Sequence, residues 1–221
     1  MEVFNVIWGF RKLFLSGAKV TILLAVIMII GGTILGSIAA AAQSVKSDKK
    51  IAKVVRAFFR GYVELFRGAP LLTLLFFGYY GLAYLGIDID EYAACGIVLV
   101  LYAGAYICEI VRSGLESISK GQWEAGYCLG LNYLEVMIYI IFPQAFRIFL
   151  PALVGFFIAG IKDSAIVSLI GCKDIFKQAS VVINKTDMAL EIYAMIALFF
   201  FVVCYPLSLL VKKLEKRRIK A

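Results

Sequence analysis

Histidine is absent from the 221-residue chain, and the five cysteines are scattered along it. Histidine is the commonest metal ligand and the side chain most often used as a general base, so its absence removes the main residue of both kinds of site. The cysteines stand at positions 95, 108, 128, 172 and 204, with no C-x-x-C spacing. We interpret them as small apolar packing residues, and we predict neither a metal site nor a disulfide framework.

The phosphate-binding pattern G-x-x-x-x-G-K-[ST] is also missing, so the sequence offers no glycine-rich loop to cradle nucleotide phosphates. A hydrolase working inside a membrane would need an embedded nucleophile and base, yet the chain has no histidine and no matched pair of aspartates. We therefore predict that the chain alone is not an enzyme and holds no cofactor. No internal repeat, low-complexity tract or linker divides the sequence, which favours a single domain.

Charge is scarce as well: 17% of the residues are charged and 62% are hydrophobic, far from the balance of a soluble domain. Several uncharged runs are about long enough to cross ~30 Å of hydrocarbon as helices. We predict an all-α integral membrane protein with five transmembrane helices at residues 20–42, 68–87, 92–108, 148–170 and 192–211. The first run is too long for the apolar part of a signal peptide, so we expect a retained helix.

The positions of the lysines and arginines predict the orientation, because short cytoplasmic loops carry the basic excess. Basic residues follow the first and the fifth run: Lys46, Lys49, Lys50, Lys53, Arg56 and Arg60, then Lys212, Lys213, Lys216, Arg217, Arg218 and Lys220. Segment 88–91 is acidic. We predict the N-terminus outside and the C-terminus inside, although Arg11, Lys12 and Lys19 disagree. Topology and anionic inner-leaflet lipid then explain the net charge of +8, and no nucleic-acid partner is needed.

Segment 112–147 lies on the cytoplasmic side in this topology, and its sequence predicts two short helices joined by a glycine turn. Ser119 and Gln122 have the spacing of a capping box, which would place Glu124 in the first turn of a helix. Gly130 is expected to end that helix. Asn132, followed by Glu135 three residues later, is expected to cap the second helix.

The first of these helices combines aromatic and very small residues. Trp123 and Tyr127 stand one turn apart, while Ala125, Gly126 and Gly130 leave the backbone bare. A glycine inside a helix costs roughly 1 kcal/mol relative to alanine, so its presence suggests that something approaches closely. The segment is either a docking helix for another protein or an interfacial helix with two chance glycines, and we favour docking.

Glu124-Ala125-Gly126, then Gly130, then the Ile-Phe-Pro of residues 141–143 resemble the EAA signature of ABC importer permeases. Segments 62–72, 105–112, 120–124, 143–147 and 162–168 are similar to segments of the polar amino acid subfamily, and the resemblance covers residues 19–214. Three positions depart from the pattern. Gly126 replaces the second alanine, Ala69 replaces the usual threonine before Pro70, and Gly155 replaces an asparagine.

The resemblance implies a type I ABC importer permease: a transmembrane domain at 19–214 with a cytosolic EAA coupling region at 112–147. It implies a multi-pass protein of the bacterial cytoplasmic (inner) membrane. The implied partners are a second permease copy or paralogue, an extracytoplasmic solute-binding protein, and a cytosolic ABC ATPase dimer that binds the ATP and magnesium. The ATPase-docking residues would be Trp123, Glu124, Ala125, Gly126, Tyr127 and Gly130.

Ionisable residues at membrane depth are costly and usually face a helix bundle or a water-filled path. Glu64 and Arg67 are three residues apart, as are Glu109 and Arg112, so each pair could neutralise itself on one helix face. We favour a structural role for Glu109 with Arg112. For Glu64 with Arg67, a structural role and a place in the substrate path are equally favoured.

Lys162-Asp163-Ser164 interrupts the fourth run, ~20 Å from its cytosolic end at 1.5 Å per residue. The triplet offers the cation, the anion and the hydroxyl that a zwitterionic amino acid requires. It could equally be a self-neutralising pair that joins two helices. We predict a substrate path that contains Glu64, Arg67, Lys162, Asp163 and Ser164.

Together these features predict the permease subunit of an ATP-driven importer for a polar amino acid. One alternative is a secondary amino acid transporter, but the five-span count and the lack of inverted repeats disfavour it. Another is an ABC permease for a different small polar solute. The balanced charge of the path leaves cationic, acidic and neutral amino acids open, and the sequence does not distinguish a homodimer from a heterodimer.

Overall fold

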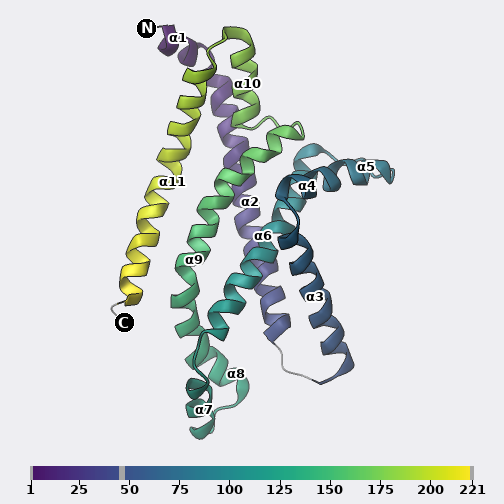
Figure 1. Cartoon of the computed structure of the whole chain (residues 1–221), viewed down its shortest axis with the longest axis vertical. Helices are drawn as coiled ribbons and strands as arrows, with labels where there is room; N and C mark the ends of the chain where they lie inside the picture. Colours follow the sequence, from purple (N-terminus) through teal and green to yellow (C-terminus); the bar gives the residue numbers. More distant parts are fainter. Residues whose placement is uncertain (1, 45–47, 220–221) are drawn as a thin grey trace.

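The computed structural model describes residues 2–44 and 48–219, and in these ranges the chain forms helices without any strand (Figure 1). Lys46 and Lys220 of the orientation argument lie outside these ranges. The elements are α1 (Glu2–Gly9), α2 (Arg11–Ser44), α3 (Lys50–Gly68), α4 (Leu71–Phe76), η1 (Phe77–Gly81), α5 (Leu82–Tyr84), α6 (Glu91–Glu116), α7 (Lys120–Cys128), α8 (Tyr133–Glu135), η2 (Val136–Ile141), α9 (Phe142–Asp163), η3 (Ser164–Leu169), α10 (Ile175–Thr186) and α11 (Ala189–Ile219).

Four helical units are long and apolar enough to cross a membrane: Arg11–Ser44, Glu91–Glu116, Tyr133–Leu169 and Ala189–Lys216. A bent pair, Lys50–Gly68 with Leu71–Tyr84, supplies a fifth crossing if it is counted as one span. The predicted all-α membrane class is therefore confirmed, but the predicted bounds of the second, third and fourth spans are not those of the helices.

The second span is not the straight helix expected over residues 68–87. The chain bends by 111° between its two helices, and the break falls at Ala69 and Pro70. Proline has no backbone N–H and forces the preceding residue out of the helical region, and Ala69 is extended at φ −104° and ψ 143°. Glu64 and Arg67 therefore lie in the last two turns of α3 rather than at the start of a span.

The fourth span begins about four turns earlier than residue 148. Asn132 caps it as predicted: its side chain accepts from the backbone N–H of Glu135 at 3.1 Å, and the Glu135 carboxylate accepts from the N–H of Asn132 at 2.7 Å. The helix does not stop after this first turn. It continues through the π-helical η2 into α9, because residues 136–142 are apolar and contain no helix breaker. The predicted second short cytosolic helix is thus wrong.

The third span also differs from its predicted bounds, since α6 continues past residue 108 as far as Glu116. Arg112, predicted as the first residue of the cytosolic segment, therefore lies within the same continuous helix as Glu109.

Helices α2 and α6 pack backbone against backbone. Gly32 and Gly36 stand four residues apart on α2, and a Cβ at Gly32 would lie 2.5 Å from the Cβ of Ala103 on α6. A Cβ at Gly36 would lie 2.7 Å from the carbonyl oxygen of Gly104. Small residues at this spacing let two membrane helices approach closely, which explains the G-G-T-I-L-G segment of the sequence.

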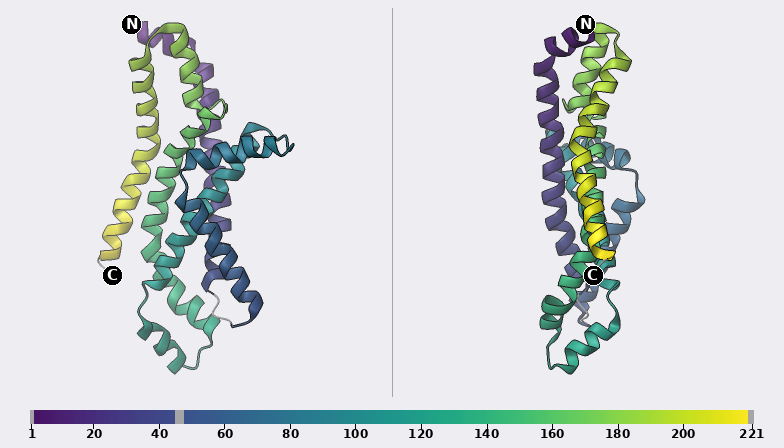
Figure 2. Two further views of the ribbon diagram at one scale, coloured as in Figure 1. Left: turned by 45° about the vertical axis from the view of Figure 1, so that its right-hand side comes forward. Right: turned by 90° about the vertical axis from the view of Figure 1, so that its left-hand side faces the viewer.

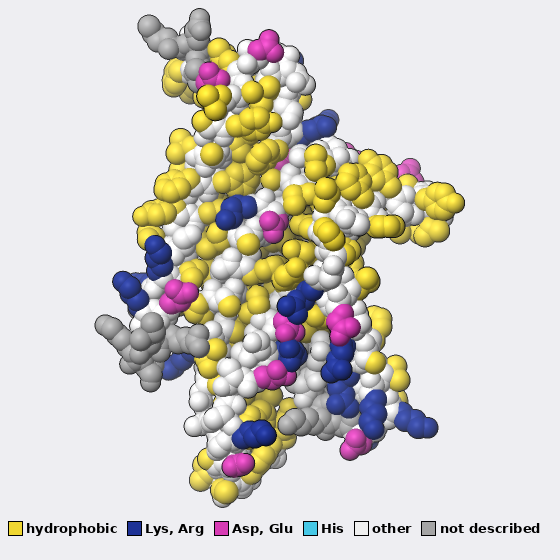
Figure 3. Space-filling view, in the orientation of Figure 1, with side chains coloured by type: hydrophobic (Ala, Val, Ile, Leu, Met, Phe, Trp, Pro, Cys, Tyr) yellow, Lys and Arg dark blue, Asp and Glu magenta, His cyan; other side chains and the backbone are white. Residues whose placement is uncertain are grey.

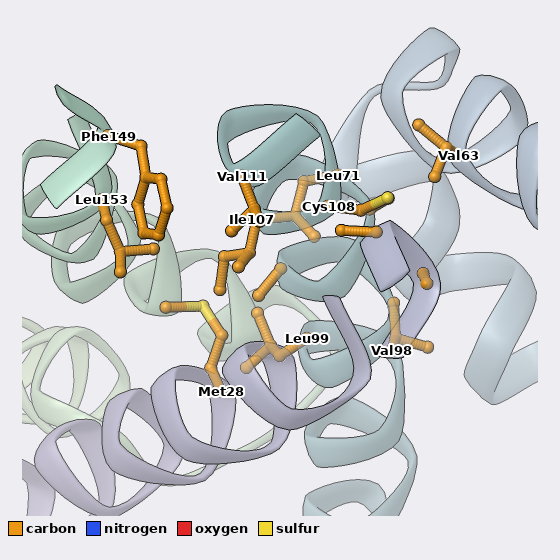
Figure 4. Packing of buried hydrophobic residues seen from close by; sticks show 14 of the residues in the cluster. Met28, Val63, Leu71, Val98, Leu99, Ile107, Cys108, Val111, Phe149 and Leu153 are labelled. Atoms are coloured by element: carbon orange, nitrogen blue, oxygen red, sulfur yellow. The ribbon is translucent and has the colours of Figure 1, made fainter. Parts of the chain in front are cut away.

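The main hydrophobic core lies between α2, α6 and α9. Figure 4 shows Met28 of α2 among Leu99 and Ile107 of α6, with Phe149 and Leu153 of α9 nearby. Met28, Leu99 and Ile107 are completely buried. These three helices form the frame against which α3 and α11 pack.

Different elements lie at the two ends of the molecule. The N-terminus and α10 lie at one end, whereas α7 lies at the other and the chain ends on that side (Figures 1 and 2). Helices α4 and α5 project sideways from the bundle (Figure 2). This arrangement agrees with an odd number of crossings and places the docking candidates at the end away from the N-terminus.

Candidate functional site

Helix α7 carries the predicted docking residues, but its beginning differs from the prediction. The structure describes no capping hydrogen bond from the side chain of Ser119. The side chain of Gln122 instead accepts from Nε2 of Gln144 at 3.0 Å, which joins α7 to the beginning of α9. The expected Ser119–Gln122 capping box is therefore absent, and Glu124 lies in the second turn rather than the first.

The end of α7 is formed as expected. Gly130 adopts a φ of +78°, which is favourable only for glycine. Its N–H donates to the carbonyl of Tyr127 at 2.9 Å, and the N–H of Leu131 donates to the carbonyl of Gly126 at 3.2 Å. These two bonds define a Schellman motif, so Gly130 sets the direction in which the chain leaves the helix.

Gly126 faces the chain itself rather than a partner. It is buried, and a Cβ on it would lie 2.7 Å from Cγ2 of Val136 and 3.0 Å from Cδ1 of Ile140. The absence of a side chain here allows α7 to pack against η2. The idea that Gly126 leaves room for another protein is therefore corrected, since its own chain already occupies that space.

Trp123 also packs inward. Its ring stacks on that of Tyr133 at a centroid distance of 5.5 Å and lies 6.4 Å from the ring of Tyr127. Because Trp123 is half-buried against its own chain, it positions α7 on the bundle.

Among the docking candidates of α7, Glu124, Ala125 and Tyr127 are exposed, and so is Leu129 directly after the helix. Leu129 is 76% exposed and did not figure among the sequence candidates. The signal that could have identified it is a large apolar residue next to the glycine that ends a cytosolic helix, where no core is available to cover it.

A cavity of about 980 Å³ lies beside α7, between α2, α3 and α6. Charged side chains line much of it: Arg56, Arg60, Glu64, Arg67, Glu109 and Arg112. Figure 3 shows basic and acidic side chains gathered over α3 and the adjoining part of α6. The cavity therefore offers both signs of charge to a small polar solute.

A chain of ion pairs runs along one wall of this cavity. Arg112 contacts Glu109 at 2.6 Å and Glu116 at 2.6 Å, so the predicted pair of Glu109 with Arg112 is confirmed. Arg67 contacts the same Glu109 at 3.4 Å, across from α3 to α6. The guanidinium of Arg67 also lies 5.6 Å from the ring centroid of Tyr106.

The predicted pair of Glu64 with Arg67 is not formed, because Arg67 turns toward the carboxylate of α6 instead. Glu64 is exposed to the cavity and forms no ion pair with any residue that the structure describes. Its carboxylate is thus available to a solute.

Lys162-Asp163-Ser164 lies elsewhere, where α9 passes into the 3₁₀-helix η3. The triplet is in the last third of the unit Tyr133–Leu169, so it lies farther from the beginning of that unit than the ~20 Å predicted from a start at residue 148. Ser164 is buried, and its hydroxyl donates to the carbonyl of Ile161 at 2.8 Å. Lys162 is exposed and Asp163 is half-buried, and neither is in an ion pair within the described chain.

The structure therefore does not bring the five predicted path residues together. Glu64 and Arg67 line the cavity, whereas Lys162-Asp163-Ser164 is not part of its lining.

Comparison with known proteins identifies the family. Residues 32–220 match the family described as the binding-protein-dependent transport system inner membrane component. The chain belongs to this family. Its fold is that of the type I ABC importer permeases, and the EAA-like segment of α7 is a feature of the same family.

Relatives of this inner membrane component are similar over nearly their whole length. A probable glutamine ABC transporter permease of Bacillus subtilis (strain 168) is 35% identical over 95% of both chains. An L-cystine transport system permease of the same organism is 34% identical over 95% of this chain and 88% of its own. The glutamine transport system permease of Escherichia coli (strain K12) is 34% identical over 96% of both.

Two solved structures resemble the fold. The crystal structure of an amino acid ABC transporter with histidines has a TM-score of 0.88 and 34% identity, and covers 97% of this chain and 98% of its own. An inward-facing MetNI methionine ABC transporter has a TM-score of 0.73, covering 94% of this chain and 97% of its own. At 16% identity the second likeness shows the fold alone.

Proposed function

We propose that this inner membrane component is the permease subunit of an ATP-driven importer that moves a polar amino acid across the bacterial cytoplasmic membrane. Relatives at 34–35% identity carry the names of glutamine and L-cystine permeases, which supports the substrate class. ATP and magnesium would be bound by a separate ATPase dimer, because the sequence has no phosphate-binding loop.

The observation that carries the proposal is the charged cavity beside the docking helix. A zwitterionic amino acid presents a carboxylate and an ammonium group, and a site for it needs a cation and an anion within reach of one another. The unpaired carboxylate of Glu64 and the guanidinium of Arg60, one turn apart on α3, both line the cavity. Arg67 lies beside them but already contacts Glu109.

Lys162-Asp163-Ser164 forms the second part of the proposed path. Since the triplet is not part of the cavity lining, we infer that the solute meets the two groups in succession. Lys162 would attract the carboxylate of the solute and Asp163 its ammonium group. The hydroxyl of Ser164 is buried and already bonded to Ile161, so it would serve to fix the backbone between α9 and η3.

The ATPase would dock on the exposed surface of α7. Glu124, Ala125, Tyr127 and Leu129 are exposed and would contact the partner. Gly126 and Trp123 would act indirectly, because they hold α7 against its own chain. A second permease copy or paralogue and an extracytoplasmic solute-binding protein complete the assembly that the family implies.

Reconstitution into liposomes tests the proposal. The chain, with its ATPase and its solute-binding protein, should take up labelled polar amino acids only when ATP is supplied to the ATPase side. A panel of glutamine, glutamate, arginine and cystine would identify the substrate. Uptake driven by an ion gradient in the absence of ATP would instead establish a secondary transporter.

Labelling of single cysteines in intact cells tests the orientation. Cysteines at positions 49 and 216 should be protected from an impermeant maleimide, and one at position 88 should react. Equal reaction of positions 49 and 88 would contradict the proposed topology.

A further inference from the structure

Two cysteines that are far apart in the sequence meet near the beginning of α6. The Sγ atoms of Cys95 and Cys172 lie 3.6 Å apart, although 77 positions separate them. Cys95 belongs to the second turn of α6, and Cys172 belongs to the turn between η3 and α10. Both side chains are almost completely buried.

Neighbouring contacts hold the same two segments together. The backbone N–H of Lys173 donates to the hydroxyl of Tyr92 at 3.1 Å, and Sγ of Cys172 lies 3.6 Å from the carbonyl oxygen of Glu91. Gly171, at a φ of +125°, makes the turn that directs Cys172 toward α6. The juxtaposition of the two thiols is therefore built into the backbone on both sides.

The two sulfurs are in non-bonded contact. A disulfide has an S–S distance of about 2.0 Å, so the two sulfurs need to approach by roughly 1.5 Å. Rotation about the two side chains supplies a movement of this size without a rearrangement of the helices.

The location suits oxidation. This end of α6 directly follows the acidic segment 88–91, which the distribution of basic residues places outside the cytoplasm. Disulfides persist in extracytoplasmic compartments and are rare in the cytosol. By contrast, Cys108 lies further along α6 beside Gln43, whose Nε2 is 3.3 Å from its sulfur, and it has no thiol partner among the described residues.

We propose that Cys95 and Cys172 form a disulfide bond that ties the beginning of α6 to the turn before α10. The bond forms by exchange with an external disulfide. One cysteine thiolate attacks this disulfide, forms a mixed disulfide and releases one thiol. The second thiolate then attacks the mixed disulfide and releases the other thiol, so two electrons pass to the external disulfide and the two cysteine protons end on the released thiols.

The surroundings of the pair determine when the exchange takes place. Both thiols are almost completely buried, so an external disulfide does not reach either sulfur in the folded chain. The exchange therefore occurs while the chain folds, or when the turn at residues 170–174 opens. Once formed, the bond limits how far the outer ends of the third and fourth spans can separate, a property beyond the proposed transport function.

Thiol counting in the full-length chain tests the proposal. The Cys128→Ser variant, which lacks the exposed thiol and retains four cysteines, is equilibrated in membranes with oxidised glutathione, quenched with acid, denatured and alkylated. Two thiols should react before reduction and four after it. Peptide mass mapping should find residues 95 and 172 in one linked species.

Matched variants identify the pair. Adding Cys204→Ser, which removes a buried thiol elsewhere, should leave the linked species intact, whereas adding Cys95→Ser should abolish it. Four reactive thiols before reduction would overturn the proposal. It would also be overturned by separate glutathione adducts at residues 95 and 172 in place of the linked species. Both readouts come from denatured protein and do not require the variants to transport.

Discussion

The ion-pair chain of Arg67, Glu109, Arg112 and Glu116 and the pair Lys162 with Asp163 both belong to membrane-spanning elements, but their charges are held differently. In the chain every charge contacts an opposite charge at 2.6 to 3.4 Å. Lys162 and Asp163 are sequence neighbours that form no such contact with described residues. Charged side chains that pair with one another indicate a role in joining helices. Charged side chains without such a partner are available to a solute.

The largest effect should follow from removal of the unpaired charges. The double variant Lys162→Met with Asp163→Leu keeps the region neutral, so no charge is stranded. Loss of charge-assisted contacts worth about 1.5–3 kcal/mol should reduce ATP-dependent uptake roughly ten- to a hundredfold at matched expression. Thermal stability in detergent should change little. Uptake at the wild-type rate would assign the triplet a purely structural role and reverse the comparison.

The next effect concerns the paired charges. Glu109→Gln leaves Arg67 and Arg112 without their shared carboxylate, and because these groups are partly exposed we expect a loss of about 1–3 kcal/mol in folding free energy. The control is Glu116→Gln at the exposed end of the chain, which should cost less than about 0.5 kcal/mol. Denaturation midpoints of the purified variants measure both. Equal midpoints for the two variants would show that Glu109 is not central to the network.

The comparison of buried and exposed residues on α7 predicts a smaller effect. Gly130→Leu places a branched side chain at a φ of +78°, which costs of the order of 1–2 kcal/mol in strain, so the turn and Leu129 should shift. Co-purification of the ATPase should fall about tenfold at equal membrane abundance. Gly121→Ala, at an open position of the same helix, is the matched control and should retain the ATPase. Undiminished retention with Gly130→Leu would show that this surface is not the docking element.

The smallest expected effect is on the pH dependence of stability, and it follows from a comparison of two aspartates that both cap helices. Asp90 caps α6 at the surface, whereas Asp174 caps α10 while completely buried, with Oδ2 lacking a hydrogen-bond partner within the described structure. Burial raises the pKa of Asp174 to about 6. The folded state then binds more protons than the unfolded state between the two pKa values, so stability falls as the pH rises through this window.

This linkage amounts to about 1 kcal/mol between pH 5 and pH 7. Asp174→Asn keeps a capping side chain and removes the titration, so it should abolish that part of the pH dependence. Asp90→Asn, at the exposed cap, is the matched control for the loss of a capping carboxylate. Midpoints of thermal unfolding at pH 5, 6 and 7 provide the measurement, and an identical pH profile for Asp174→Asn and the wild type would contradict the assignment.

Sequence patterns predicted the ends of helices correctly where all the residues that form the end lie in one short stretch of sequence. Asn132 and Glu135 form the predicted capping box, and Gly130 ends α7 as predicted. The pattern at Ser119 was wrong, because Gln122 finds a partner in Gln144, which becomes a neighbour only through the fold. Pro70 indicates by itself that the helix is loosened near residue 70, but the size of the bend, 111°, depends on the packing of the two helices.

The sequence by itself determined the membrane class, the helical content and the family, because hydrophobic run length and the EAA-like segment are properties of the chain read in order. Only the tertiary structure decided the partners of individual side chains. In the structure Arg67 contacts Glu109 rather than Glu64, Gly126 packs against Val136, and Cys95 lies beside Cys172. These contacts join different elements of the fold, and their choice depends on how those elements pack together, which the spacing of residues along one helix does not specify.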